Sequence, residues 1–142
     1  KGGGIFSQES NFQIFSTLIS KNTAPENASA IITQNNSQMN LDRCTITENS
    51  SENGTIKSEN GGEIFISNSI IYENTNSGIF NGQVGDIPFF EVAYSLLDEE
   101  WDGSYSCSEC INVNPEFVNP EDNNFTLQAS SLCIDAGNGR RL

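Results

Sequence analysis

Three segments of the chain share one pattern of apolar, small and polar positions. Each begins with an apolar residue and has further apolar residues two and seven positions later. A small residue stands five positions after the first residue, and Asn stands ten positions after it. The segments begin at Phe12, Met39 and Ile64, and a weaker fourth copy begins at Phe90, so the starts lie 27, 25 and 26 residues apart. A spacing this regular is typical of repeat proteins.

The spacing of apolar residues within each copy predicts strands. Alternation of apolar and polar residues indicates a strand with one buried face. A second set of apolar residues keeps the same rhythm along the chain, at Ile5, Ile31, Ile56 and Ile79. Two or three short strands in every repeat, separated by turns rich in Asn, Gly and Ser, describe one coil of a β-solenoid. We therefore expect an all-β fold, a right-handed parallel β-helix with about four coils and a C-terminal cap.

Equivalent residues of successive coils should stack about 4.8 Å apart, the usual distance between paired strands. Two inward stacks are predicted: Ile14, Leu41, Ile66 and Val92, and Ile19, Ile46, Ile71 and Leu97. The small residues, among them Cys44, should lie where the coil bends inward, with the Cys44 thiol buried and inert.

The repeated Asn residues have two interpretations. Asn22, Asn49 and Asn74 could form a ladder of hydrogen-bonded amides inside a turn, where Asn tolerates left-handed backbone. Alternatively, a row of Asn could line a sugar-binding face. The ladder is the interpretation that we favour.

The pattern changes near the C-terminus. We expect residues 1–105 to form the β-helix coils, and residues 106–142 to form a terminal coil and the cap. A cap is needed because the end of a solenoid exposes its core and open strand edges. The apolar residues available for the cap are Phe117, Phe125, Leu127, Leu132 and Ile134.

Several short motifs resemble one known group of proteins. They are Gly2-Gly3-Gly4-Ile5-Phe6, Tyr94-Ser95-Leu96-Leu97, and the run from Asn114-Pro115-Glu116-Phe117-Val118 to Cys133-Ile134-Asp135-Ala136-Gly137. In these motifs the chain resembles bacterial secreted proteins of the pectin-lyase-like superfamily, in particular polymorphic outer membrane proteins and choice-of-anchor surface proteins. The resemblance implies a secreted or surface-anchored β-helix that is often part of a larger adhesin-like polypeptide. The superfamily also includes polysaccharide lyases and hydrolases, but no lyase signature is present in this chain.

The charge of the chain restricts its partners. The net charge is −13, and only six Lys and Arg residues are present. A nucleic-acid-binding protein needs a basic surface, so nucleic acid is not an expected partner. Anionic membrane surfaces are not expected partners either, for the same reason. No apolar run approaches the ~18 residues of a membrane span.

The opening residues look like the middle of a repeat, and flanking β-helix coils are therefore expected upstream.

An acidic loop follows the fourth repeat. Asp98, Glu100 and Asp102 lie two residues apart and could direct their carboxylates to one side of an extended loop. Oxygen-rich acidic loops suit Ca²⁺, so these three residues are a candidate calcium site, and no other cofactor is expected. The alternative is a solvated acidic turn.

Three cysteines lie in the C-terminal part of the chain. Cys107 and Cys110 have CxxC spacing, and Cys133 follows. A zinc site would need further ligands, and the chain has no His. A structural disulfide in an oxidising compartment is the better interpretation. Any two of the three could pair, or none could.

The basic residues inside the coils are Lys21, Arg43 and Lys57, and they do not share a row of the repeat. A catalytic base and a residue that binds the substrate carboxylate would have to lie close together. We interpret these side chains as solvated strand positions that discourage pairing at sheet edges.

The expected function is a non-catalytic structural or adhesive module of an extracellular or cell-surface protein, with glycans or other surface-protein domains as candidate partners. The alternative is a carbohydrate-active fragment, either lyase-like or glycan-binding.

Overall fold

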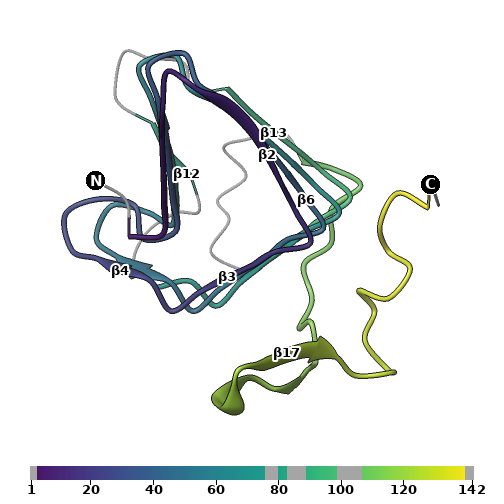
Figure 1. Ribbon diagram of the computed structural model, residues 1–142. Coiled ribbons are helices and arrows are strands. Elements are labelled where there is room, and N and C mark those ends of the chain that lie inside the picture. Colours follow the sequence, from purple (N-terminus) through teal and green to yellow (C-terminus); the bar gives the residue numbers. More distant parts are fainter. Residues whose placement is uncertain (1–2, 76–79, 83–88, 99–106, 140–142) are drawn as a thin grey trace.

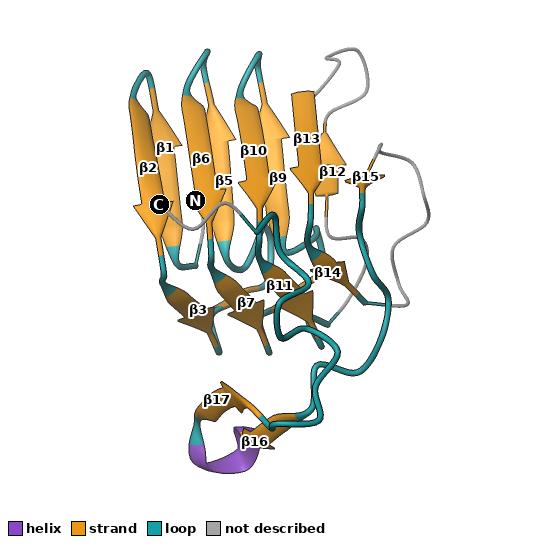
Figure 2. Ribbon diagram, turned by 90° about the vertical axis from the view of Figure 1, so that its right-hand side faces the viewer, coloured by secondary structure: helices purple, strands orange, loops and turns teal. Residues whose placement is uncertain are grey.

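The chain forms a parallel β-solenoid of about three turns. The structure is a computed structural model that describes residues 3–75, 80–82, 89–98 and 107–139. Viewed along its axis, the solenoid has a roughly triangular cross-section (Figure 1). The chain runs clockwise in this view as it recedes from the reader, so the coil is right-handed (Figures 1 and 2).

Each coil contributes one strand to each side of the triangle. The first coil contains β1 (Ile5–Gln8), β2 (Asn11–Phe15), β3 (Leu18–Ser20) and β4 (Thr23–Ala24). The second contains β5 (Ile31–Gln34), β6 (Gln38–Asp42), β7 (Thr45–Thr47) and β8 (Ser50–Ser51). The third contains β9 (Ile56–Glu59), β10 (Glu63–Ser67) and β11 (Ile70–Tyr72). After these come β12 (Phe80–Gly82), β13 (Phe89–Ala93), β14 (Leu96–Leu97) and β15 (Cys107–Ser108).

The strands form three parallel sheets along the solenoid (Figure 2). The first sheet has the order β1-β5-β9-β12, the second β2-β6-β10-β13-β15, and the third β3-β7-β11-β14. A small additional sheet pairs β4 with β8. Each short strand pairs its backbone N–H and C=O groups with the equivalent strands of the neighbouring coils. Stacking of the coils is therefore sufficient to satisfy these backbone groups.

The core consists of stacked aliphatic side chains, and both predicted stacks are confirmed. In the second sheet, Ile14 pairs with Leu41, Leu41 with Ile66, and Ile66 with Val92. In the third sheet the register is Ile19, Ile46, Ile71 and Leu97. Most members of these stacks are buried, and only Ile14 in the first coil is half-buried.

The first sheet confirms two of the three predicted pairings and corrects the third. Ile5 pairs with Ile31, and Ile31 with Ile56. Ile56 then pairs with Phe80, whereas the sequence rhythm pointed to Ile79, which lies outside the described residues. The prediction failed because the length of the coil differs by one residue between copies, and a shift of one residue exchanges the two faces of a strand.

The corners of the coil place non-glycine residues in the left-handed region. Lys21, Glu48 and Glu73, with φ between 52° and 58°, each immediately precede a ladder Asn. The expectation that the Asn itself would adopt this conformation was therefore wrong. The Asn side chain is needed beside the bend, where its amide bonds to the neighbouring coil, and this interaction holds the preceding residue in a conformation that costs roughly 1–2 kcal/mol.

After β15 the chain leaves the coil and forms an antiparallel hairpin. The hairpin consists of β16 (Phe117–Asn119), a short 3-10 turn η1 (Pro120–Asp122) and β17 (Asn124–Leu127). It lies beside the third sheet rather than across the end of the coil (Figures 1 and 2). The ring of Phe117 packs edge-to-face on Tyr72 and on Phe125. Of the residues expected in a cap, Phe117 is buried, whereas Leu132 and Ile134 are exposed.

Candidate functional site

The acidic loop can be described only at its first residue. Asp98 follows β14, its side chain is buried, and its N–H donates to the carbonyl oxygen of Ile71 at 3.1 Å. Glu100 and Asp102 lie outside the described residues. The calcium site therefore stays a prediction. Within the described part of the chain, no three Cys, Asp or Glu side chains gather as a metal site would require.

The cysteines of the CxxC motif continue two rows of the repeat. Cys107 pairs with Val92 at the end of one aliphatic stack. Because Ile111 pairs with Leu96, Cys110 falls at the register of Ser95. The structure joins Cys107 to Cys110 in a disulfide, one of the pairings that the sequence left open, and leaves Cys44 and Cys133 as free thiols.

The two free thiols are poor nucleophiles. Burial raises the pKa of the Cys44 thiol, whose Sγ contacts the carbonyl oxygens of Ile14 and Asp42 at 3.5 Å. Burial likewise raises the pKa of the Cys133 thiol in the C-terminal segment. Because the thiolate is the reacting form, a raised pKa slows the reaction of both groups with electrophiles at neutral pH.

A thiol titration tests this arrangement of cysteines. In the folded chain at neutral pH, the half-buried Cys133 should react slowly with a disulfide reagent, and the buried Cys44 should not react on the same time scale. Unfolding without reductant should release two thiols, and unfolding with reductant should release all four. Release of four thiols without reductant would show that the Cys107–Cys110 bond is absent.

Each basic side chain of the coils has a carboxylate partner within the chain. Lys21 Nζ is 3.3 Å from Glu48, Arg43 Nε is 3.0 Å from Asp42, and Lys57 Nζ is 2.6 Å from Glu59. Lys57 lies in β9 of the first sheet, whereas Lys21 follows β3 and Arg43 precedes β7, two neighbouring strands of the third sheet.

The interpretation of Lys57 as a solvated position was wrong. Its side chain is only 11% exposed, and its ammonium group lies 2.6 Å from a carboxylate oxygen of Glu59. Lys21 and Arg43, in contrast, are exposed as expected.

The Asn residues form the predicted ladder. Asn49 Oδ1 accepts hydrogen bonds from the backbone N–H of Asn22 (3.1 Å) and from its Nδ2 (2.9 Å). Asn74 Oδ1 accepts the same two bonds from Asn49, at 3.0 and 2.9 Å. The side chain of Asn49 is fully buried (0% exposed), so this row cannot serve as a sugar-binding face.

A second ladder, which the sequence analysis did not identify, follows the row of small residues. The backbone N–H of Cys44 donates to Ser69 Oγ at 3.0 Å, and the N–H of Ser69 donates to Ser95 Oγ at 3.1 Å. Each hydroxyl in turn donates to the carbonyl oxygen two residues earlier, of Ser67 or Ala93. The signal was present in the sequence, since most of these small residues carry a hydroxyl group.

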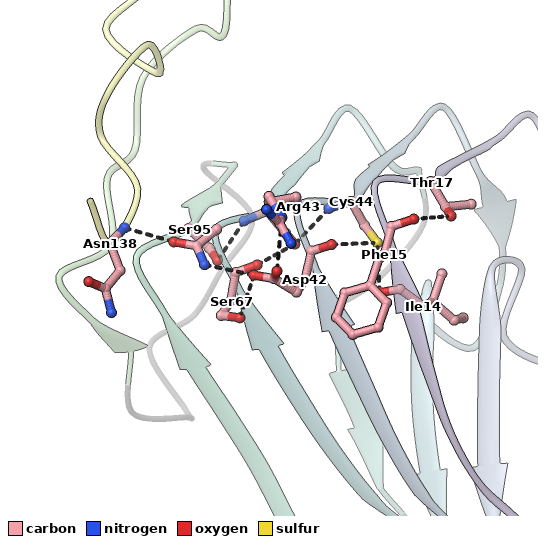
Figure 3. A network of polar contacts seen from close by, with 11 residues as sticks. Ile14, Phe15, Thr17, Asp42, Arg43, Cys44, Ser67, Ser95 and Asn138 are labelled. Atoms are coloured by element: carbon pink, nitrogen blue, oxygen red, sulfur yellow. Dashed lines mark hydrogen bonds and ion pairs between the residues drawn. The ribbon is translucent and has the colours of Figure 1, made fainter. Parts of the chain in front are cut away.

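Polar contacts also tie the C-terminal segment to the coil (Figure 3). Asp42 Oδ1 accepts from Ser67 Oγ (3.0 Å) and from Asn68 Nδ2 (2.7 Å). Asn68 Oδ1 then accepts the backbone N–H of Asn138 at 2.7 Å. A cavity of about 200 Å³ lies between this segment and the corner of the coil.

A more open groove lies between the hairpin and the first two coils. Its volume is about 360 Å³, and it is lined by Thr17, Leu18, Arg43, Asn123, Asn124 and Phe125, among others. Lys21 contacts two of the lining residues, with Nζ 2.6 Å from Asn123 Oδ1 and 5.9 Å from the centre of the Phe125 ring. The groove therefore combines an aromatic ring with amide and guanidinium groups.

The comparisons with known proteins give no family. No protein-family model, no curated protein and no solved structure matches this chain. Among the described residues, no helix is long and apolar enough to cross a membrane. The fold is therefore assigned from the strand pairing alone, and the function has to be argued from the residues.

Proposed function

We propose that this chain is a non-catalytic structural or adhesive module of a secreted or cell-surface protein. The observation that carries the proposal is the placement of the basic side chains. A polysaccharide lyase needs a base beside the acidic proton and a second group that binds the neighbouring carboxylate. Here Lys57 lies on another sheet from Lys21 and Arg43, and all three are within 3.3 Å of a carboxylate of the chain itself.

The continuous stacking of the coils supports a mechanical role. The aliphatic stacks and the Asn and Ser ladders run from one coil to the next, so each coil is held by its neighbours along the whole solenoid. Such repetition yields a stiff element whose length grows with the number of coils. The acidic surface (net charge −13) keeps an extended element soluble and disfavours binding to nucleic acid.

Two features support a location outside the cell. The Cys107–Cys110 disulfide is a bond that persists in oxidising compartments. The sequence motifs resemble those of bacterial β-helix surface proteins, in which such modules form part of adhesin-like polypeptides. The partners that we propose are accordingly other domains of the same surface protein or glycans.

Two assays test the absence of catalysis and the cellular location. We expect no unsaturated uronate product when the chain is incubated with polygalacturonate or alginate in the presence of CaCl₂. Antibodies raised against the folded chain should label intact cells of the source organism. Formation of the ultraviolet-absorbing product would reject the structural role in favour of a lyase, and labelling that requires cell lysis would reject the surface location.

The groove beside the hairpin favours a second candidate, glycan binding without catalysis. Aromatic rings pack on the apolar faces of sugars, while amides and guanidinium groups bind their hydroxyl or carboxylate groups. A glycan array compared with the Arg43→Ala variant separates the two candidates. Binding that this substitution abolishes would assign glycan recognition to the groove, and binding that it leaves intact would place it elsewhere.

A further inference from the structure

The N-terminal end of the solenoid is open on all three sheets. Strands β1, β2 and β3 are the outermost strands of their sheets, and among the described residues each pairs on one side only. The inward residues of this coil are also less covered than those of the next coil. Ile5, Phe12 and Ile14 are half-buried, whereas the residues that pair with them, Ile31, Met39 and Leu41, are fully buried.

The Asn ladder gives this end a direction. At each step, the backbone N–H and the side-chain Nδ2 of one Asn donate to the Oδ1 of the Asn in the following coil. Asn22 is the first member, and its Oδ1 accepts no hydrogen bond within the part of the chain that the structure describes. The open end of the ladder is therefore an acceptor.

The backbone presents the complementary groups. Thr45 donates its N–H to the carbonyl oxygen of Thr17 at 3.0 Å, and Ser50 donates to that of Asn22 at 2.9 Å. In the first coil, Leu18 and Thr23 occupy the positions equivalent to Thr45 and Ser50. Their N–H groups consequently face the open edge, where carbonyl groups of a preceding coil would accept them.

We propose that this end is an interface for one further parallel β-helix coil that carries Asn at the ladder position. The N–H and Nδ2 of that Asn would donate to Asn22 Oδ1, and its coil would cover Ile5, Phe12 and Ile14. The interface continues the coil-to-coil contact already present between the first and second coils. This inference rests on the proposed role as a structural module.

A second copy of the chain fits this end poorly. In a head-to-head dimer, two Asn22 acceptor oxygens would face each other. The twofold axis could also pair at most one of the three sheets with the same sheet of the other copy. In a head-to-tail stack, the five-residue strand β2 would meet β15, which has two residues and bears the Cys107–Cys110 disulfide. The polarity and the strand lengths therefore favour a parallel coil with Asn at the ladder position over a second copy.

The test adds such a coil. A copy of residues 31–55 is joined directly to Ile5 in place of residues 1–4, so that Ile5 follows the copy as Ile56 follows the original. We expect the unfolding midpoint to rise by about 5 °C or more. Amide exchange at Leu18 and Thr23 should slow by about tenfold or more, because their N–H groups gain acceptors. The same extension with N49A in the copied coil should lose most of the increase in midpoint.

Two further variants and one measurement make the result decisive. Inserting residues 31–55 a second time between Thr55 and Ile56 shows whether the copied coil stacks at a site known to accept it. A second extension, built from residues 56–79, guards against failure of one particular sequence. If neither extension slows exchange at Leu18 and Thr23, the proposal is wrong, although a structural role for the module could still hold. Sedimentation velocity of the native chain supplies the remaining outcome, since dimerisation that protects the same amides would assign this end to a second copy.

Discussion

Replacing Asn49 with Ala should destabilise the chain by roughly 3–4 kcal/mol. Asn49 is the central member of the ladder and is fully buried. Its Nδ2 donates to the carbonyl oxygens of Ile19 and Thr47, both at 3.0 Å, as well as to Asn74. Truncation removes these donors and the acceptor for Asn22, and buried polar groups that lose their partners each cost about 1–3 kcal/mol.

The matched control is the same substitution at the end of the ladder. Asn22→Ala should cost only about 1 kcal/mol, because Asn22 is half-buried and water can replace its hydrogen bonds to Ser20 and Asn49. Equilibrium unfolding in urea with unchanged slopes measures both values. Equal losses for the two variants would mean that the ladder contributes through turn propensity rather than through buried hydrogen bonds.

The sequence was sufficient to predict the coil because two periodicities coincide. Alternation within a strand sets which face is buried, and the spacing near 25 residues sets which residues stack. The stacks that contain Ile46 and Ile66 follow directly from these two rules. Ile79 was assigned wrongly because the second rule tolerates changes of one residue in the turns, whereas the first rule does not.

The corners were less predictable. Asn tolerates left-handed backbone better than Lys or Glu does, so local preference pointed to Asn22, Asn49 and Asn74. In the structure the preceding Lys or Glu takes that conformation, because the Asn side chain is used to bridge two coils. Hydrogen bonds between residues 25 or 27 positions apart decide the outcome, and no property of a single residue contains that information.

The C-terminal segment shows the limit of composition as a guide. Phe117, Leu132 and Ile134 are all apolar, yet only Phe117 is buried, against Tyr72 and Phe125. The sequence showed that apolar residues were available to cover the coil. Which surface they cover depends on where the chain leaves the coil after β15, and the sequence pattern does not set that direction.

The role of the aliphatic stacks is tested by the Ile46→Ala variant. Ile46 is fully buried between Ile19 of the preceding coil and Ile71 of the following coil. Truncation removes the transfer free energy of three carbon atoms and leaves a cavity that two flanking coils cannot both close. We expect a loss of roughly 2–5 kcal/mol in the free energy of unfolding, and about 1 kcal/mol for the milder Ile46→Val change.

Two controls separate burial from position in the coil. Gln13→Ala changes an exposed, outward-facing residue of β2 and should cost less than about 0.5 kcal/mol. Ile19→Ala tests the open end, because Ile19 has a stacking partner on one side only among the described residues. The free energy of unfolding should fall clearly less for Ile19→Ala than for Ile46→Ala, since a cavity at an open end can fill with water. If Ile19→Ala and Ile46→Ala cost the same, the first coil would already be covered, and the inference that this end binds a further coil would lose its main structural support.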